Sequence, residues 1–264
     1  FSIARFVSAR CLPQTRLCAK SSAEMELKMN IALLLAGGSG TRTEQDVPKQ
    51  FFNVYEKPII IYTLEAFQKH PDIDGIIVSC LEGWHEILSA YAREAGITKL
   101  RKVVCGGENG QASARNALRE LKDICGEDDV VIIHDAIRPM VSAEIISDCI
   151  VKCRQYGSGL AAMRCQETIV ETNDGIKGDT GISRNHIMRV QTPQAYKYGT
   201  VMNAHEKALE QGITNAVYTN TLMLDLGETL YFAQGSEKNL KITTMEDVEI
   251  FKALLRMKKE DWVK

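Results

Sequence analysis

Short apolar runs alternate along the chain with longer stretches in which apolar residues recur at helical spacing. The runs predict strands at 31–35, 75–81, 102–105, 130–134 and 159–163. The longer stretches predict helices at 59–69, 84–95, 111–122, 143–156, 199–211 and 245–257. Strands that are apolar throughout and alternate with helices are typical of a mostly parallel sheet covered on both faces. We therefore predict an α/β fold with a doubly wound, Rossmann-like sheet.

A polar, turn-rich segment at about 164–191 interrupts this alternation. Within it, Asn173-Asp174-Gly175 is a sequence that favours a hairpin turn. We predict that the segment forms a β-arm that protrudes from the domain. Such an arm commonly contacts a second subunit, so we expect a homodimer.

The composition fits one main domain, which we place at 29–264. The chain has 264 residues, of which 45% are hydrophobic and 25% charged, and its net charge is −2. This charge argues against a nucleic-acid backbone as partner, which would require a basic face. No apolar run reaches the roughly 18 residues that a membrane helix needs, so we expect no membrane association.

Residues 1–28 form a basic extension with Arg5, Arg10, Arg16 and Lys20 and no acidic residue before position 23. This composition resembles an organelle transit peptide. An artefact or a mis-set start is the alternative, and we leave the extension out of the fold. We expect a cytoplasmic protein, or one of a plastid or other organelle if the extension is a genuine transit peptide.

The cysteine pattern also favours a reducing compartment. None of the eight cysteines forms a C-x-x-C pair. Cys80 and Cys105 lie in apolar, strand-like runs, where we expect buried thiols. Cys149 and Cys153 would share a helix face, but no histidine is near enough in the sequence to complete a zinc site.

A glycine-rich loop follows the first predicted strand. Gly37, Gly38 and Gly40 allow a tight turn whose N–H groups can approach phosphate oxygens. Arg42 and Lys49 then supply positive charge, so the loop is a candidate triphosphate site. It is neither a P-loop nor a complete dinucleotide fingerprint. A plain strand-to-helix turn is the alternative.

Further groups of polar residues follow later strands, and each has a plain structural alternative. The glycines at 106–107 can simply form a turn, Asp135 and Arg138 a capped turn, Thr192-Pro193 the start of a helix, and Lys241 a solvated surface group. The groups are 106–113, 134–139, Arg184 with 192–194, and 239–243.

In their order along the chain, these groups form a known pattern. From about 30 to 255 the sequence resembles the cytidylyltransferases that join CTP to a polyol phosphate, which have the fold of nucleotide-diphospho-sugar transferases. The matching pieces are AGGSGTR, PKQ, KPIIIYTLEAF, HDAIRP, RVQTPQ and NLKITT. The resemblance implies release of pyrophosphate on transfer of CMP to 2-C-methyl-D-erythritol 4-phosphate, for isoprenoid synthesis, or to ribitol 5-phosphate, for teichoic acid or capsule.

The resemblance also implies roles for individual residues. Nucleotide-binding positions are Ala36, Gly37, Gly38, Gly40, Gly107, Glu108, Ser113 and Ala136. Catalytic positions are Arg42, Lys49, Lys241 and Asp135. Acceptor-binding positions are Asp135, Arg138, Thr168, Arg184, Thr192 and Lys241, with Thr168 and Arg184 reaching the site of the other subunit. Mg²⁺, or another divalent cation, would be held mainly by the CTP phosphates and not by a protein metal site.

Two departures from the family pattern leave alternatives open. Gly110 stands where an arginine is usual, and Asn220 stands where an aspartate is usual. These departures support a non-catalytic nucleotide-binding protein as one alternative. Another sugar-phosphate nucleotidyltransferase is the other, because the glycine loop is shared with sugar-nucleotide pyrophosphorylases, and the acceptor stays open. We expect His134 to be a packed or capping histidine. A hydrolase triad of Ser113, His134 and Asp135 lacks support, because adjacent His and Asp cannot easily orient each other.

Overall fold

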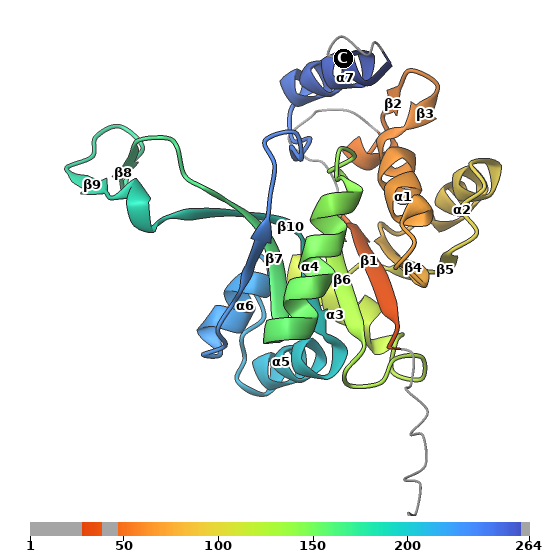
Figure 1. The fold of residues 1–264 in the computed structure, drawn as a ribbon, viewed down its shortest axis with the longest axis horizontal. Helices are drawn as coiled ribbons and strands as arrows, with labels where there is room; N and C mark the ends of the chain where they lie inside the picture. Colours follow the sequence, from red (N-terminus) through yellow and green to blue (C-terminus); the bar gives the residue numbers. More distant parts are fainter. Residues whose placement is uncertain (1–27, 39–46, 260–264) are drawn as a thin grey trace, which may run out of the picture.

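The computed structural model describes residues 28–38 and 47–259. Its centre is a seven-stranded sheet in the order β11-β7-β10-β6-β1-β4-β5 (Figure 1). The strands are β1 (Asn30–Ala36), β4 (Gly75–Cys80), β5 (Leu100–Cys105), β6 (Val130–Asp135), β7 (Ser158–Arg164), β10 (Met188–Lys197) and β11 (Phe232–Gln234). The predicted mostly parallel sheet is confirmed, but β10 was not predicted. It runs antiparallel between β6 and β7.

Helices cover both faces of the sheet because successive residues of a strand point to opposite faces. Along β1, Ala32 and Leu34 pack into one core cluster, whereas Ile31 and Leu33 pack into the other. The first face is covered by α1 (Ile59–Lys69), α2 (His85–Glu94) and α4 (Ala143–Tyr156). The second is covered by α3 (Gly110–Arg119), α5 (Tyr198–Glu210) and α6 (Thr219–Asp225).

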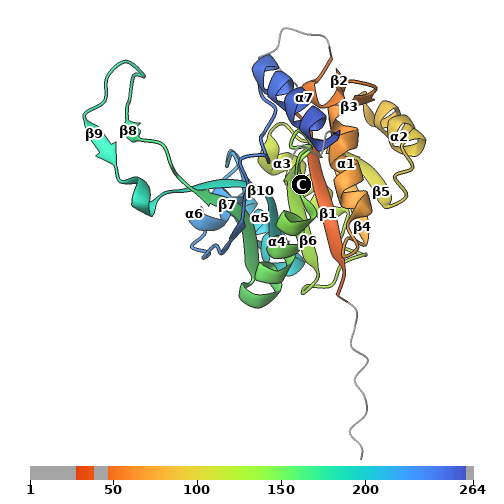
Figure 2. The same ribbon diagram turned by 45° about the horizontal axis from the view of Figure 1, so that its top comes forward.

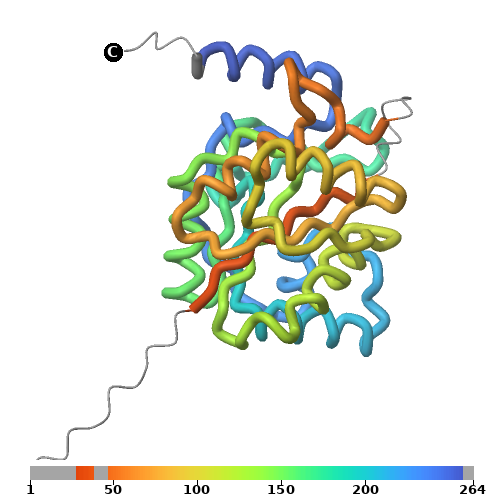
Figure 3. The backbone as a smooth tube through the Cα atoms, turned by 90° about the vertical axis from the view of Figure 1, so that its right-hand side faces the viewer, coloured from red at the N-terminus to blue at the C-terminus, as the bar shows by residue number. Residues whose placement is uncertain are grey.

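The helix α7 (Met245–Lys259) lies across one end of the domain (Figure 3). It packs beside the small antiparallel pair β2 (Asn53–Val54) and β3 (Lys57–Pro58). The rings of Tyr62 and Phe251 meet edge to face there, 5.2 Å apart. The residue Thr243, just before α7, is bonded to Lys49 of the short 3₁₀ helix η1 (Lys49–Phe51).

The polar segment after β7 forms an arm that projects from the sheet, as predicted (Figures 1 and 2). It contains the antiparallel strands β8 (Ile169–Glu171) and β9 (Thr180–Ile182), followed by the 3₁₀ helix η2 (Arg184–His186). In the connection between the two strands, the carboxylate of Asp174 accepts bonds from the backbone N–H groups of Ile176 and Lys177. The arm is therefore folded by local bonds.

Of the cysteines that the structure describes, all but Cys105 are buried, which corrects the prediction for that residue. Cys80 is fully buried, whereas Cys105 is exposed. The reason is that β5 is an edge strand of the sheet and is covered less completely than β4. Across the described ranges, no helix is long and apolar enough to cross a membrane.

Candidate active site

A cavity of about 490 Å³ opens where the carboxyl ends of β1 and β6 lie side by side. After β1, the next strands β4 and β5 are added on one side of it, whereas β6 is added on its other side, so the strand order reverses at β1. Ligands of doubly wound sheets bind at such a switch point. The lining residues that the sequence had singled out are Ala36, Gly37, Gly38, Lys49, Gly107, Glu108, Ser113, Asp135 and Lys241.

The first wall of the cavity is the start of the glycine loop. The amide of Gln50 donates to the carbonyl oxygens of Ala36 at 2.8 Å and Gly38 at 3.2 Å. Next to it, Lys49 Nζ donates to the carbonyl of Thr243 at 2.8 Å. These bonds fix the loop entrance and bring Lys49 to the cavity. The predicted Gly40 and Arg42 lie outside the described residues.

The second wall is the turn from β5 into α3. The backbone N–H of Gly107 donates to the hydroxyl of Ser113 at 2.9 Å. A Cβ at Gly107 would lie 2.4 Å from that of Ala112, so only glycine fits this close approach. Asn109 caps α3 by accepting from the N–H of Ala112 at 2.9 Å. The positive end of the helix dipole thus meets the cavity, where it favours anions.

The third wall centres on Asp135, the last residue of β6. One carboxylate oxygen is 3.1 Å from Lys241 Nζ, and the other is 2.9 Å from Arg138 Nε. The hydroxyl of Thr192 also accepts from the backbone N–H of Asp135 at 3.0 Å. Burial alone would raise the pKa of Asp135, but the two cations outweigh it and hold the pKa below its ordinary value. The carboxylate is therefore ionised at neutral pH.

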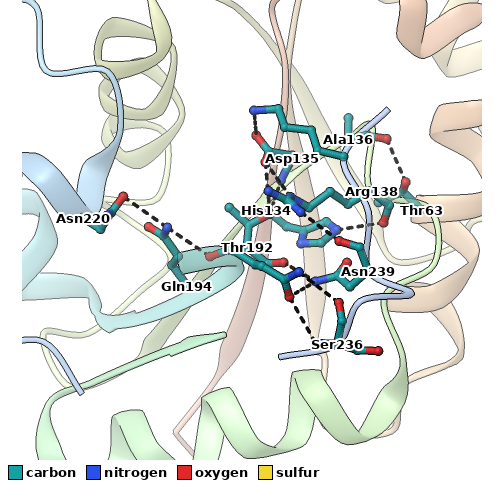
Figure 4. A network of polar contacts seen from close by, with 12 residues as sticks. Thr63, His134, Asp135, Ala136, Arg138, Thr192, Gln194, Asn220, Ser236 and Asn239 are labelled. Carbon is teal, nitrogen blue, oxygen red and sulfur yellow. Dashed lines mark hydrogen bonds and ion pairs between the residues drawn. The ribbon is translucent and has the colours of Figure 1, made fainter. Parts of the chain in front are cut away.

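A buried amide, Asn239, holds this cluster in place from behind (Figure 4). Arg138 Nη1 donates to the carbonyl of Asn239 at 2.8 Å, and Asn239 Nδ2 donates to the carbonyl of Thr192 at 2.8 Å. Gln191 extends the network to the backbone of Ser236. The cations and the carboxylate are thus oriented by bonds between distant parts of the chain.

His134 has a structural role, as predicted. Its Nε2 lies 3.2 Å from the carbonyl oxygen of Arg138, and its ring packs against Phe67. Complete burial is the main cause that lowers the pKa of His134 to about 4. The hydrolase triad gains no support, because the hydroxyl of Ser113 bonds to Gly107 and the Asp135 carboxylate faces the two cations.

Some predicted residues lie elsewhere. Thr168 and Arg184 are exposed on the arm, where Arg184 donates to the carbonyl of Gln166, and the structure does not bring them to the cavity of the same chain. Ala136 is buried behind the cavity, and its carbonyl accepts from the hydroxyl of Thr63. The alternative that Thr192-Pro193 starts a helix is wrong, because both residues lie inside β10, joined by a cis peptide bond.

Residue-by-residue prediction missed several contributors to the site. Gln50 and Asn239 stood within the quoted motifs, but their buried amide bonds depend on contacts across the fold. Val217 and Tyr218, which also line the cavity, carried no recognisable signal. Lys241 is not the solvated surface group of the plain alternative, since it is half-buried and bonded to Asp135.

Comparison with known proteins decides the family. A sequence model described as 2-C-methyl-D-erythritol 4-phosphate cytidylyltransferase matches residues 30–257. The chain belongs to this family. A ribitol-5-phosphate cytidylyltransferase of Lacticaseibacillus paracasei is 48% identical over 232 residues, which cover 87% of this chain and 99% of the relative. A 2-C-methyl-D-erythritol 4-phosphate cytidylyltransferase of Clostridium botulinum is 34% identical, covering 87% of this chain and 98% of the relative.

A solved structure of the family agrees with the fold. The 2-C-methyl-D-erythritol 4-phosphate cytidylyltransferase of Francisella tularensis aligns with a TM-score of 0.70 at 26% identity, covering 86% of this chain and 99% of that one. The predictions of the family, of a nucleotidyltransferase enzyme and of the α/β fold are therefore confirmed.

The structure of this cytidylyltransferase shows the contacts of Asn220 and Gly110, the two residues that depart from the family pattern. The side-chain oxygen of Asn220 accepts from the amide of Gln194 at 3.3 Å (Figure 4). Gly110 begins α3, and a Cβ there would lie 3.1 Å from the carbonyl oxygen of Val217. A backbone segment therefore lies beside Gly110.

Proposed function

We propose that this protein transfers CMP from CTP to ribitol 5-phosphate and releases pyrophosphate. The observation that carries the proposal is the Asp135 carboxylate held between Lys241 and Arg138 beside the cavity. A relative named for ribitol 5-phosphate is 48% identical, against 34% for one named for methylerythritol phosphate. This difference favours ribitol 5-phosphate as the acceptor.

The reaction needs no protein nucleophile, because a phosphate oxygen of the acceptor attacks the α-phosphorus of CTP as pyrophosphate leaves. Catalysis then consists of positioning the two substrates and offsetting their charge. Two unit charges 4 Å apart repel by about 1 kcal/mol in water and about 4 kcal/mol at an effective dielectric constant of 20. Lys49 and Lys241 offset this repulsion from two walls of the cavity.

Asp135 has a different task from the cations. As an ionised carboxylate it offers several lone pairs, and its bonds to Lys241 and Arg138 leave acceptor capacity for a substrate hydroxyl. We infer that it orients the polyol, while Arg138 and Thr192 keep the carboxylate in place. In the glycine loop, Arg42 would add charge at the triphosphate.

A divalent cation fits this chemistry through the nucleotide. In the described part of the chain, no three or more His, Cys, Asp or Glu residues gather as a metal site. The CTP phosphates would therefore supply most oxygen ligands, as Mg²⁺ prefers. When bound there, Mg²⁺ would supply positive charge that offsets the charge developing on the phosphates.

We further infer that the enzyme works as a homodimer whose arms exchange residues. Thr168 and Arg184 are exposed on the arm and are not among the residues that line the described cavity of the same chain. The arm also exposes Val170 and Ile176 to solvent. If a partner subunit covers this apolar surface, Thr168 and Arg184 of one subunit would reach the cavity of the partner subunit. A cytoplasmic location accords with the free thiols of the described cysteines.

The test is pyrophosphate release by the purified protein with Mg²⁺ and CTP. Parallel reactions contain ribitol 5-phosphate, methylerythritol 4-phosphate, a hexose 1-phosphate or no acceptor, and a nucleotide panel replaces CTP. We expect the highest kcat/KM with CTP and ribitol 5-phosphate. Methylerythritol phosphate is the second candidate, because the matching family model carries that name. CTP binding without turnover of any acceptor would instead indicate a non-catalytic nucleotide-binding protein.

A further inference from the structure

The segment 213–218 closes one side of the cavity, although it belongs to the loop between α5 and α6. Val217 and Tyr218 both line the cavity. Val217 lies beside Gly110 at the start of α3, and Tyr218 lies beside Lys241. The segment thus spans the region between the Gly107 turn and the Asp135 cluster.

Two side chains that flank Gly110 hold this segment. Asn109 Nδ2 donates to the carbonyl of Thr214 at 2.9 Å. The buried amide of Gln111 donates to the carbonyl of Ile213 at 2.6 Å and accepts from the N–H of Ala216 at 2.8 Å. We call these three bonds the α3 latch. They fix the backbone immediately before Tyr218.

Gly110 makes room for the latched segment. A Cβ at this position would lie 3.1 Å from the carbonyl oxygen of Val217, which is closer than most such contacts. The buried Ala216 packs with Ala208 and Leu222 and anchors the segment from its other side. A larger residue at 110 would have to displace a segment that is held at both faces.

Tyr218 presents its ring to the Lys241 ammonium. Lys241 Nζ lies 5.3 Å from the ring centroid, within the range of a cation–π interaction, and 3.1 Å from the Asp135 carboxylate. At the start of α6 the backbone of Tyr218 is bonded to Thr221, whose hydroxyl donates to the Tyr218 carbonyl at 2.8 Å. The ring is therefore not needed for that bond.

We propose that Tyr218, fixed by the α3 latch, is a positioning residue that holds the Lys241 ammonium toward the substrate phosphates. The kinetic part of this inference rests on the proposed cytidylyl transfer. Loss of the ring leaves Lys241 with Asp135 as its charged partner, and fewer of its conformations then face the cavity. The expected effect of one exposed cation–π contact is about 2- to 5-fold.

The test compares Tyr218→Leu with Tyr218→Phe, which retains the aromatic face. We expect Tyr218→Leu to raise the KM for the acceptor and the Kd for CTP, measured by calorimetry, by about 2- to 5-fold. Tyr218→Phe should remain at the wild-type values. Equal values for the Leu and Phe variants would overturn the proposal. The CTP titration needs no turnover, so it decides the role of Tyr218 even if the wild type transfers CMP to no acceptor.

A second pair of variants tests the latch. Gln111→Met removes two latch bonds and should raise the KM and Kd as Tyr218→Leu does. The double variant Gln111→Met/Tyr218→Leu should raise them no further than either single variant. Gly110→Val should act in the same direction. Gly126→Val is its matched control, since the nearest atom to a Cβ there is 3.8 Å away. Additive effects in the double variant would show that the latch does not act through Tyr218. Thermal melting of each variant verifies that it is folded.

Discussion

The cavity end of the sheet and the arm are built in opposite ways. Around Asp135, Arg138 is a local partner three positions away, but Lys241 is 106 positions away and Thr192 is 57 positions away. In the arm, β8 has no strand partner but β9 among the described residues, and the bonds of the connecting loop are local. The cavity end is thus fixed by the fold, whereas the arm depends on its own hairpin.

This difference indicates where a second chain is needed. The charged cluster around Asp135 is complete within one chain and is largely buried. The arm exposes Ile176 by 89% and Val170 by 51%, so it buries little apolar surface of its own. A site that combines both regions therefore needs the arm to pack on another surface.

The largest effect is expected at the fixed end, on Lys49. Lys49→Ala removes a cation aimed at the phosphates, and we expect turnover to fall by about 10² to 10³. Pyrophosphate release under saturating CTP measures it. Lys207→Ala, on an exposed position of α5, is the matched control and should match the wild type. A loss of only a few-fold in Lys49→Ala would remove Lys49 from the catalytic set.

Asp135→Asn tests whether the fixed end is held by charge. At pH 7 we expect the free energy of unfolding to fall by about 1 to 3 kcal/mol, because two cations lose their partner. The folded pKa of Asp135 is lowered, so its contribution is present above the unfolded pKa and is lost as the pH falls through the folded value. The gap between wild type and variant should therefore close in acid. Denaturant unfolding measures it, and Asp128→Asn, at an exposed ion pair, is the control.

A smaller effect should come from His205, buried beneath the sheet on α5. Burial is the main cause that lowers its pKa to about 4, with Arg115 adding to the shift. The unfolded chain then binds more protons below pH 6.5, so this group costs about 1 kcal/mol of stability between pH 6.5 and 5.5. His205→Leu should flatten the fall of stability over that range. His186→Gln in the exposed arm should not, and an unchanged slope in His205→Leu would refute the assignment.

Much of the frame was predictable because apolar periodicity reports burial directly. The strand predicted at 75–81 is β4, and the helix predicted at 143–156 is α4 with the same bounds. β10 escaped prediction, since RVQTPQ mixes polar residues and a proline into a strand. Its polar side chains serve the site, as with Thr192, and do not fill the core.

The sequence predicted those site residues that belong to recognisable motifs. Asp135, Lys49 and Lys241 were named, and they line one cavity. The sequence could not reveal the bond from Lys49 to Thr243 or the ring of Tyr218 beside Lys241, because these contacts join residues that no local pattern relates. Cys105 was predicted to be buried but is exposed. Its strand β5 lies at the edge of the sheet, and the amino-acid composition of a strand does not reveal its position in the sheet.

The most direct test of an active site shared between two chains is subunit complementation. Asp135→Asn damages the fixed end and Arg184→Ala damages the arm, so each homodimer should be strongly impaired. Co-expression with different tags yields heterodimers in which one site has both regions intact. If the arm acts on the partner's cavity, the random mixture should recover about a quarter of the wild-type pyrophosphate release. A mixture no more active than the mean of the two homodimers, or a chain that is active as a monomer, would contradict a shared site.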